Sequence, residues 1–200
     1  MLPKKAAQTS PSFYSKMELT SRSQKTNGYS ALCTAAACGN VSIIRLLLDN
    51  GAAIDKTDVE GYPALAYAAK FGQTAAVKEL LKRGATADGA ANDGFTALLT
   101  AVLFSQTDVA TALIRHGANV NTADASGITP LMLASKNENI EIMKLLLNSG
   151  SIVNAKTQLG DTPLRFAAWK DNTECVELLL NHGAATGNNN CPAIQSAGGC

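Results

Sequence analysis

The sequence predicts an all-α solenoid in which five short helix pairs stack side by side and are joined by short hairpin loops. Two sets of glycines support this prediction, because each set recurs every 33 residues without insertion or deletion. The first set is Gly28, Gly61, Gly94, Gly127 and Gly160, and the second is Gly51, Gly84, Gly117, Gly150 and Gly183. A fixed period of this length is typical of stacked repeats rather than of a globular domain.

The first helix of each repeat is predicted in a short alanine-rich segment that follows the first glycine, such as "ALAYAA" or "PLRFAA". Thr129-Pro130 and Thr162-Pro163 favour a helix start, because the threonine hydroxyl can cap free N–H groups and proline is tolerated in the first turn. Small residues such as Ala68 and Ala69 allow a neighbouring helix to approach closely.

A second helix is predicted ahead of the second glycine of each repeat. Apolar residues three and four positions apart, such as Ile44, Leu47 and Leu48, have the spacing of a helix with one buried face. The second glycine then suits a left-handed C-cap, and the polar segment after it, such as "ANVNTADAS", predicts a hairpin. Because one such helix pair cannot bury its own apolar face, neighbouring repeats are expected to stack.

The period, together with "TPLMLAS", "TPLRFAA", "LLLNSG" and "GANVNTAD", resembles the ankyrin repeat family over residues 28–187. The resemblance implies an elongated solenoid with a concave face. The histidine of the family's Thr-Pro-Leu-His tetrapeptide is absent from every repeat, where the equivalent residues are Cys33, Ala66, Leu99, Met132 and Arg165. In the family this histidine usually bridges backbone groups, so its absence implies a weaker network between loop and helix without a change of fold.

The two ends of the sequence do not follow the repeat. Residues 1–27 match no repeat, and we expect a mostly disordered tail with a turn of helix near "FYSKMEL". Residues 188–200 contain "CPAIQSAGGC", which is similar to the start of a sixth first helix. We therefore expect a fragment or early stop of a longer array, and the alternative function is the recognition part of a larger protein with an enzymatic or channel domain beyond Cys200.

Composition makes several classes of partner and location unfavourable. The net charge is +1 with no long basic block, so nucleic acid and an anionic membrane surface are poor partners. No apolar stretch approaches the roughly 18 residues that span a bilayer, and the N-terminus lacks the apolar run of a secretory signal. The five cysteines have no metal-binding spacing, which favours reduced thiols in an intracellular protein, cytoplasmic or nuclear.

The candidate catalytic residues have plain structural interpretations. His116 and His182 occupy the same position before the second glycine, where polar or cationic residues complement the end of a helix. Cys175 takes a position that is predicted to lie in the core, since the other repeats place apolar residues there: Ile43, Ala76, Val109 and Ile142. The sequence therefore predicts no enzyme, no cofactor and no metal site.

The resemblance implies binding of another protein through the loops and the inner face of the first helices. Six of the ten aromatic residues lie at positions that are usually exposed there: Tyr29, Tyr62, Phe71, Phe95, Phe104 and Trp169. Because aromatic residues dominate many interfaces, we expect a binding stripe along repeats one to three. Packing between adjacent repeats is the alternative for these side chains. Tyr67 and Phe166 lie within the first helices and are expected to be half-buried.

Leu103 completes the predicted stripe, and Lys136 and Lys170 make the same face more polar at repeats four and five. The expected partner is a protein or an extended peptide with apolar anchors and, near the lysines, acidic residues. The protein itself is expected to be a monomer. A different alternative follows from the resemblance alone: some ankyrin arrays are hydroxylated on an asparagine of the hairpin segment, and Asn121 and Asn154 occupy that position.

Overall fold

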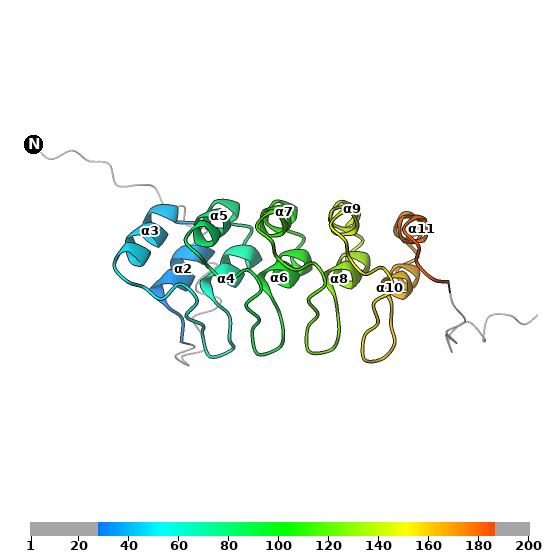
Figure 1. The fold of residues 1–200 in the computed structure, drawn as a ribbon, viewed down its shortest axis with the longest axis horizontal. Coiled ribbons are helices and arrows are strands. Elements are labelled where there is room, and N and C mark those ends of the chain that lie inside the picture. The colour runs from blue at the N-terminus through cyan, green and yellow to red at the C-terminus, as the bar shows by residue number, and fades with distance from the viewer. Residues whose placement is uncertain (1–27, 187–200) are drawn as a thin grey trace, which may run out of the picture.

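The computed structural model describes residues 28–186, which form five helix pairs arranged in two rows (Figure 1). One row holds the first helix of each repeat: α2 (Ala31–Ala37), α4 (Ala64–Lys70), α6 (Ala97–Leu103), α8 (Pro130–Lys136) and α10 (Pro163–Trp169). The other row holds the second helices: α3 (Val41–Asp49), α5 (Thr74–Lys82), α7 (Thr107–Arg115), α9 (Ile140–Asn148) and α11 (Thr173–Asn181). The predicted all-α solenoid is confirmed, whereas the expectations for residues 1–27 and 188–200 lie outside the described residues.

The first helices begin where the sequence places a capping hydroxyl. Thr96, Thr129 and Thr162 each accept a hydrogen bond from the backbone N–H three residues later, and Pro130 and Pro163 occupy the first helical turn. These bonds satisfy N–H groups that have no partner inside the helix. The predicted helix start at the Thr-Pro pairs is confirmed.

The core runs along the length of the array between the two rows of helices. Alanines on the first helices are fully buried, among them Ala68, Ala101 and Ala134, and they let successive helices of the row pack closely. Leucines of the second helices, such as Leu80 and Leu113, fill the space between the rows and are also fully buried. Each repeat therefore buries its apolar face against its neighbours, as expected for a solenoid.

Two glycines of each repeat serve different conformational needs. Gly84 has a φ of +92° and ends α5, where its own N–H and that of Ala85 donate to carbonyls of the last helical turn. Gly94 lies in a loop at a φ of +85°, and a Cβ there would meet the backbone nitrogen of Ala125 at 2.6 Å. The second set of glycines caps helices and the first set, at Gly94, permits close contact between neighbouring loops.

The loops between repeats contain hairpin-type turns rather than regular strands within residues 28–186. Each turn is closed by two backbone hydrogen bonds, as from Ala91 N to the carbonyl of Phe95 and from Gly94 N to the carbonyl of Ala91, both at 2.9 Å. Single bonds also join successive loops, as from Asn92 N to the carbonyl of Glu60 at 3.0 Å. The predicted hairpins are thus present as short turns, because the few backbone bonds of each loop do not extend into a ladder of strands.

Aspartates of the loops form hydrogen bonds within the loops and to a first helix, and a network weaker than with histidine stays a prediction. The carboxylate of Asp58 accepts the N–H groups of Glu60 and Tyr62, and its second oxygen accepts the hydroxyl of Tyr67 on α4. Asp124 accepts two N–H groups of its own loop in the same way. These aspartates stabilise the turn of their own loop, and Asp58 also connects its loop to the first helix through Tyr67.

Candidate functional site

The predicted contact residues differ in their exposure on the inner face, by which we mean the loop side of the first-helix row. Tyr29, Phe71, Leu103 and Phe104 are between 41% and 50% exposed, and Trp169 is 76% exposed. Lys136 and Lys170, the two lysines among the predicted contact residues, are also exposed. Tyr62 and Phe95 are half-buried and pack against the core, so packing accounts for part of their surface, and the binding stripe stays a prediction.

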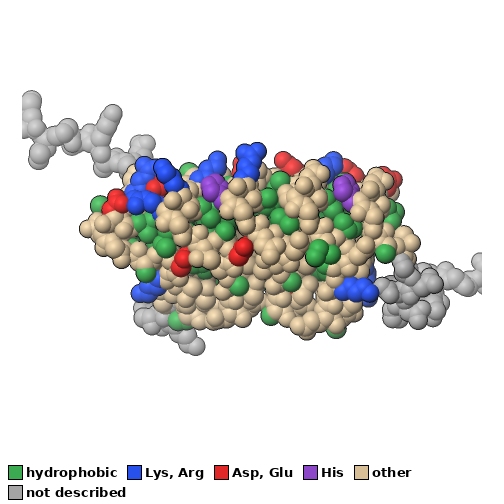
Figure 2. All heavy atoms as spheres, in the orientation of Figure 1, with side chains coloured by type: hydrophobic (Ala, Val, Ile, Leu, Met, Phe, Trp, Pro, Cys, Tyr) green, Lys and Arg blue, Asp and Glu red, His purple; other side chains and the backbone are tan. Residues whose placement is uncertain are grey.

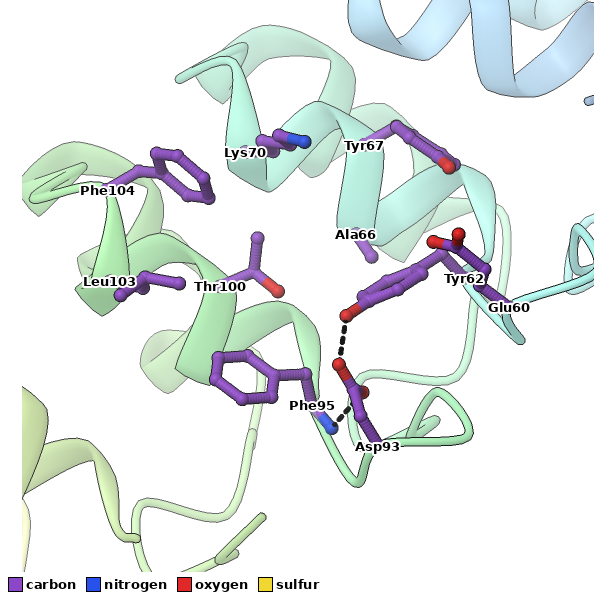
Figure 3. Close-up of a pocket in the computed structure, with 10 residues that line it drawn as sticks. All are labelled: Glu60, Tyr62, Ala66, Tyr67, Lys70, Asp93, Phe95, Thr100, Leu103 and Phe104. Atoms are coloured by element: carbon purple, nitrogen blue, oxygen red, sulfur yellow. Dashed lines mark hydrogen bonds between the residues drawn. The ribbon is translucent and has the colours of Figure 1, made fainter. Parts of the chain in front are cut away.

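Four of the predicted residues come together around one pocket between repeats two and three. This aromatic pocket has a volume of about 240 Å³ and is lined by Glu60, Tyr62, Ala66, Tyr67, Lys70, Asp93, Phe95, Thr100, Leu103 and Phe104. Figure 3 shows Ala66 and Thr100 in its middle, surrounded by the larger side chains from α4, α6 and two loops. Tyr29, Phe71, Lys136, Trp169 and Lys170 are not among its lining residues.

Lys70 organises the rim of the aromatic pocket on the side of the helix ends. Its ammonium nitrogen lies 5.8 Å from the ring centroid of Phe71 and 5.5 Å from that of Phe104. A cation at this distance from a ring face is attracted by the ring quadrupole. Lys70 therefore connects the exposed phenylalanines of two successive repeats and brings Phe71 to the edge of the pocket.

Asp93 organises the opposite rim, which is formed by the loops. Its carboxylate accepts the hydroxyl of Tyr62 and the N–H of Phe95, the latter at 3.0 Å (Figure 3). Burial and the hydrogen bond to Asp93 both raise the pKa of Tyr62 above its usual range, so its phenol stays protonated and remains a donor. The two loop aromatics are thereby fixed on either side of one carboxylate.

Tyr67 is more deeply buried than the sequence predicts. It was expected to be half-buried, but it is 7% exposed because rings from two loops enclose it. Its ring centroid lies 4.6 Å from that of Tyr29 and 6.3 Å from that of Tyr62. Burial and the hydrogen bond to Asp58 raise the pKa of Tyr67. Phe166, at the equivalent position of repeat five, is half-buried as predicted.

Several residues of the aromatic pocket are missing from the predicted set. Lys70 and Asp93 have no distinctive local motif, and each also contacts a residue about a repeat away in the chain, Phe104 and Tyr62 respectively. Thr100 is different, because a comparison of equivalent positions would have found it: with Thr34 it is one of two short members of a set that also contains Tyr67, Leu133 and Phe166. A short side chain on an otherwise filled inner face predicts a depression.

The C-terminal half of the inner face is separate and more cationic. Trp169 ends α10, Lys170 caps it, and Lys136 ends α8, so all three lie at the ends of first helices. Arg165 forms an ion pair with Asp161 one turn earlier. Elsewhere, charged side chains gather mainly along the edge formed by the second helices (Figure 2).

The residues considered for catalysis have structural roles. His116 and His182 are the C-cap residues of α7 and α11, and each ring nitrogen Nδ1 lies 2.8 Å from a carbonyl of the last turn. Cys175 is fully buried, and burial raises the pKa of its thiol, which makes it a poor nucleophile. No group of three metal-binding side chains occurs within residues 28–186.

Asn121 and Asn154 connect neighbouring loops. The side-chain oxygen of Asn121 accepts the N–H of Ile152 at 2.8 Å, and its amide nitrogen donates to the carbonyl of Gly150 at 3.2 Å. Asn154 makes the same pair of bonds to Ala185 and Gly183. Hydroxylation at these two residues stays a prediction, and the intact mass of protein from its own cells would test it by the addition of one oxygen atom.

Comparisons with known proteins agree with this architecture. A family model described as ankyrin repeats (3 copies) matches residues 13–89, 50–124, 86–157 and 122–190 in overlapping stretches. A search of curated proteins finds no match. In the part of the chain that the structure describes, no helix is long and apolar enough to cross a membrane. Because the matches together cover most of the sequence, the chain belongs to the ankyrin repeat family.

Proposed function

We propose that this chain is a non-catalytic binding module that holds an extended segment of another protein along its inner face. Ankyrin repeats are in general protein–protein interaction modules and not enzymes, and this supports the class of function. The observation that carries the site is the group of exposed apolar side chains around the aromatic pocket, namely Phe71, Leu103 and Phe104. Apolar side chains that gather on one surface mark contact sites, and aromatic residues supply much of the binding energy there.

The aromatic pocket also limits what is bound. Its volume of about 240 Å³ is below the roughly 300–1,000 Å³ of sites for small molecules. A single side chain of an extended peptide fits such a depression, and the rest of the peptide then lies over the neighbouring repeats. The segment is proposed to run toward repeats four and five, where Trp169 offers a further apolar contact.

The lysines at repeats four and five support a position for acidic residues of the partner. Lys136 and Lys170 are exposed at the ends of α8 and α10, so acidic residues are placed near them. Charges at the rim of an interface act mainly on the association rate and on its salt dependence. The variant Lys136→Glu, Lys170→Glu is expected to bind more slowly and to lose most of the salt dependence of association, as measured by surface plasmon resonance with the captured partner.

Affinity capture tests the proposal with two variants matched in the area of apolar surface that they remove. The first variant, Phe71→Ala, Leu103→Ala, Phe104→Ala, removes exposed side chains at the aromatic pocket. The control, Ile43→Ala, Leu46→Ala, Leu180→Ala, removes exposed side chains from the second helices. Both are checked by circular dichroism for an intact fold, and lysates are treated with nuclease so that capture through nucleic acid is removed.

The two variants are expected to differ. The wild-type chain and the control should capture the same proteins from a lysate of the cells that express this chain, and the pocket variant should lose them. If the pocket variant captures what the wild type captures, the inner face is not the binding site. If the proteins are lost only with the control variant, the binding site lies on the second helices.

A further inference from the structure

The aromatic pocket lies where repeat three has a shorter side chain on its first helix than repeats two, four and five, and repeat one has a threonine there as well, Thr34. One position of the first helices faces the residues that follow the first glycine of its own repeat and of the preceding one, as Tyr67 faces Tyr62 and Tyr29. This position holds Tyr67 in repeat two and Thr100 in repeat three. Thr100 lines the pocket together with Tyr62 and Phe95, and it lies at the base because only 4% of its surface is exposed (Figure 3).

The same place one repeat earlier is filled by the ring of Tyr67. Tyr29 and Tyr62 flank that ring, with centroids 4.6 Å and 6.3 Å away and interplanar angles of 46° and 60°. Tyr62 and Phe95 are the residues that correspond to Tyr29 and Tyr62 in the next repeat. The chain therefore contains an occupied and an unoccupied version of one aromatic site, and tilted ring packing at such distances is favourable beyond simple burial.

Both sites have carboxylates on the loop side, but at different positions of the repeat. In the occupied site the hydroxyl of Tyr67 donates to the loop carboxylate of Asp58. Position 91 is alanine in the next repeat, but the exposed carboxylates of Glu60 and Asp93 line the loop side of the pocket. Asp93 accepts from Tyr62 and Phe95, and its two oxygens retain capacity for a further donor. A neutral phenol suits this rim, whereas a carboxylate or phosphate would be repelled.

We propose that the aromatic pocket binds a tyrosine side chain of the partner protein, with its hydroxyl toward Glu60 and Asp93. This inference rests on the proposed function and names the anchor residue of the bound segment. Phosphorylation of that tyrosine would place a negatively charged phosphate next to the carboxylates of Glu60 and Asp93, and their repulsion would weaken binding. Lys70 is already engaged with the rings of Phe71 and Phe104 at the opposite rim.

A peptide selection on the full chain tests the proposal. A random 12-residue peptide library displayed on phage is selected on the wild-type chain, and the enriched peptides are measured on two variants. Thr100→Tyr fills the pocket from within and copies the arrangement of Tyr67. Thr173→Tyr makes the same chemical change at an exposed residue of α11 and serves as the matched control.

The expected result is enrichment of tyrosine at one position of the selected peptides. Thr100→Tyr, and replacement of that tyrosine by its phosphorylated form, should each weaken binding by at least about tenfold, while Thr173→Tyr leaves it unchanged. Peptides that depend on Phe71 and Phe104 but lack an enriched tyrosine would overturn the tyrosine site and leave the groove function standing. If no peptide is enriched, or none depends on Phe71 and Phe104, both proposals are contradicted.

A direct titration keeps the proposal testable if Thr100→Tyr does not fold. N-acetyl-tyrosinamide and N-acetyl-leucinamide are added separately to the wild-type chain, and methyl resonances of Ala66, Thr100 and Leu103 are followed by NMR. The tyrosine derivative is expected to shift these resonances in a saturable manner and the leucine derivative is not. Equal shifts from both compounds, or none from the tyrosine compound at its solubility limit, would contradict a tyrosine site.

Discussion

The hydroxyl of Tyr67 donates a hydrogen bond to the carboxylate of Asp58, and this bond joins the first helix of repeat two to its own loop. Both residues are buried, with 7% and 8% of their surfaces exposed. The other oxygen of Asp58 holds the N–H groups of Glu60 and Tyr62, so one carboxylate shapes the loop and anchors it to α4. The loop carries Tyr62 into the aromatic pocket, and the bond therefore supports the proposed site.

Tyr67→Phe is expected to lower the free energy of unfolding by about 1–3 kcal/mol, because it leaves a buried carboxylate oxygen without its donor. Tyr62→Phe is the matched control, since its hydroxyl bonds to the exposed Asp93 and water can replace it. Its expected cost is about 0.5–1 kcal/mol. Urea unfolding followed by circular dichroism measures both. Equal losses in the two variants would show that burial of the Asp58–Tyr67 bond contributes nothing extra.

Glu79 on α5 gives the array a pH-dependent contribution to stability. Its carboxylate accepts Arg45 at 2.8 Å and Arg83 at 3.4 Å, and these bonds lower its pKa below the usual 4.5. A carboxylate whose pKa is lower in the folded state stabilises the fold above its unfolded pKa, and the contribution is lost as pH falls through the folded value. The wild type is therefore expected to lose stability below about pH 5 more steeply than Glu79→Gln.

Urea midpoints measured between pH 7 and pH 3 test this assignment. The urea midpoint of the wild type should lie above that of Glu79→Gln at pH 7, and the two midpoints should converge toward low pH. Arg45→Gln removes the first of the two partners and should place its curve between them. Parallel curves for wild type and Glu79→Gln would mean that another carboxylate produces the acid sensitivity.

Ser105 follows α6 in a left-handed conformation, with a φ of +54°. The equivalent residues of repeats one and two are Gly39 and Gly72, which adopt this conformation without a steric penalty from a Cβ. Relief of that penalty exceeds the added flexibility of the unfolded chain, so Ser105→Gly is expected to stabilise the protein by about 0.5–1 kcal/mol.

The reverse change at Gly72 should destabilise the array. Gly72 has a φ of +69°, and a Cβ there would lie 2.3 Å from the side-chain oxygen of Gln106. Gly72→Ala therefore combines backbone strain with displacement of a side chain from the next repeat. Thermal unfolding of both variants checks the pair, and a lower midpoint for Ser105→Gly would contradict the strain argument.

The period of 33 residues predicts helices and their caps because those features depend on residues within one repeat. The glycines, the Thr-Pro pairs and the apolar spacing each determine local conformation, and the structure confirms them. The predicted half-burial of Tyr67 was wrong, because its actual burial depends on the rings of Tyr29 and Tyr62, which belong to two different loops. The aromatic pocket lies where Thr100 is shorter than Tyr67, Leu133 and Phe166, and this difference is visible only when the repeats are compared with one another.

Asn121 joins the loops of repeats three and four with both halves of its amide. Asn121→Asp keeps the acceptor for the N–H of Ile152 but turns the donor to the carbonyl of Gly150 into a second carboxylate oxygen. Two acceptors then face each other at the C-terminal end of α9, where negative charge is unfavourable. The variant is expected to lose about 1–2 kcal/mol of unfolding free energy.

Asn40→Asp provides the matched control for the charge change at Asn121. Asn40 is exposed at the N-cap of α3 and its side chain makes no capping bond, so a carboxylate there faces the positive end of the helix. This control is expected to be neutral or slightly stabilising, by about 0.3–1 kcal/mol. Urea unfolding of both variants at pH 7 separates the two effects. If Asn121→Asp is as stable as wild type, the donor bond to Gly150 does not hold the loops together, and the N–H of Ile152 alone accounts for the contact.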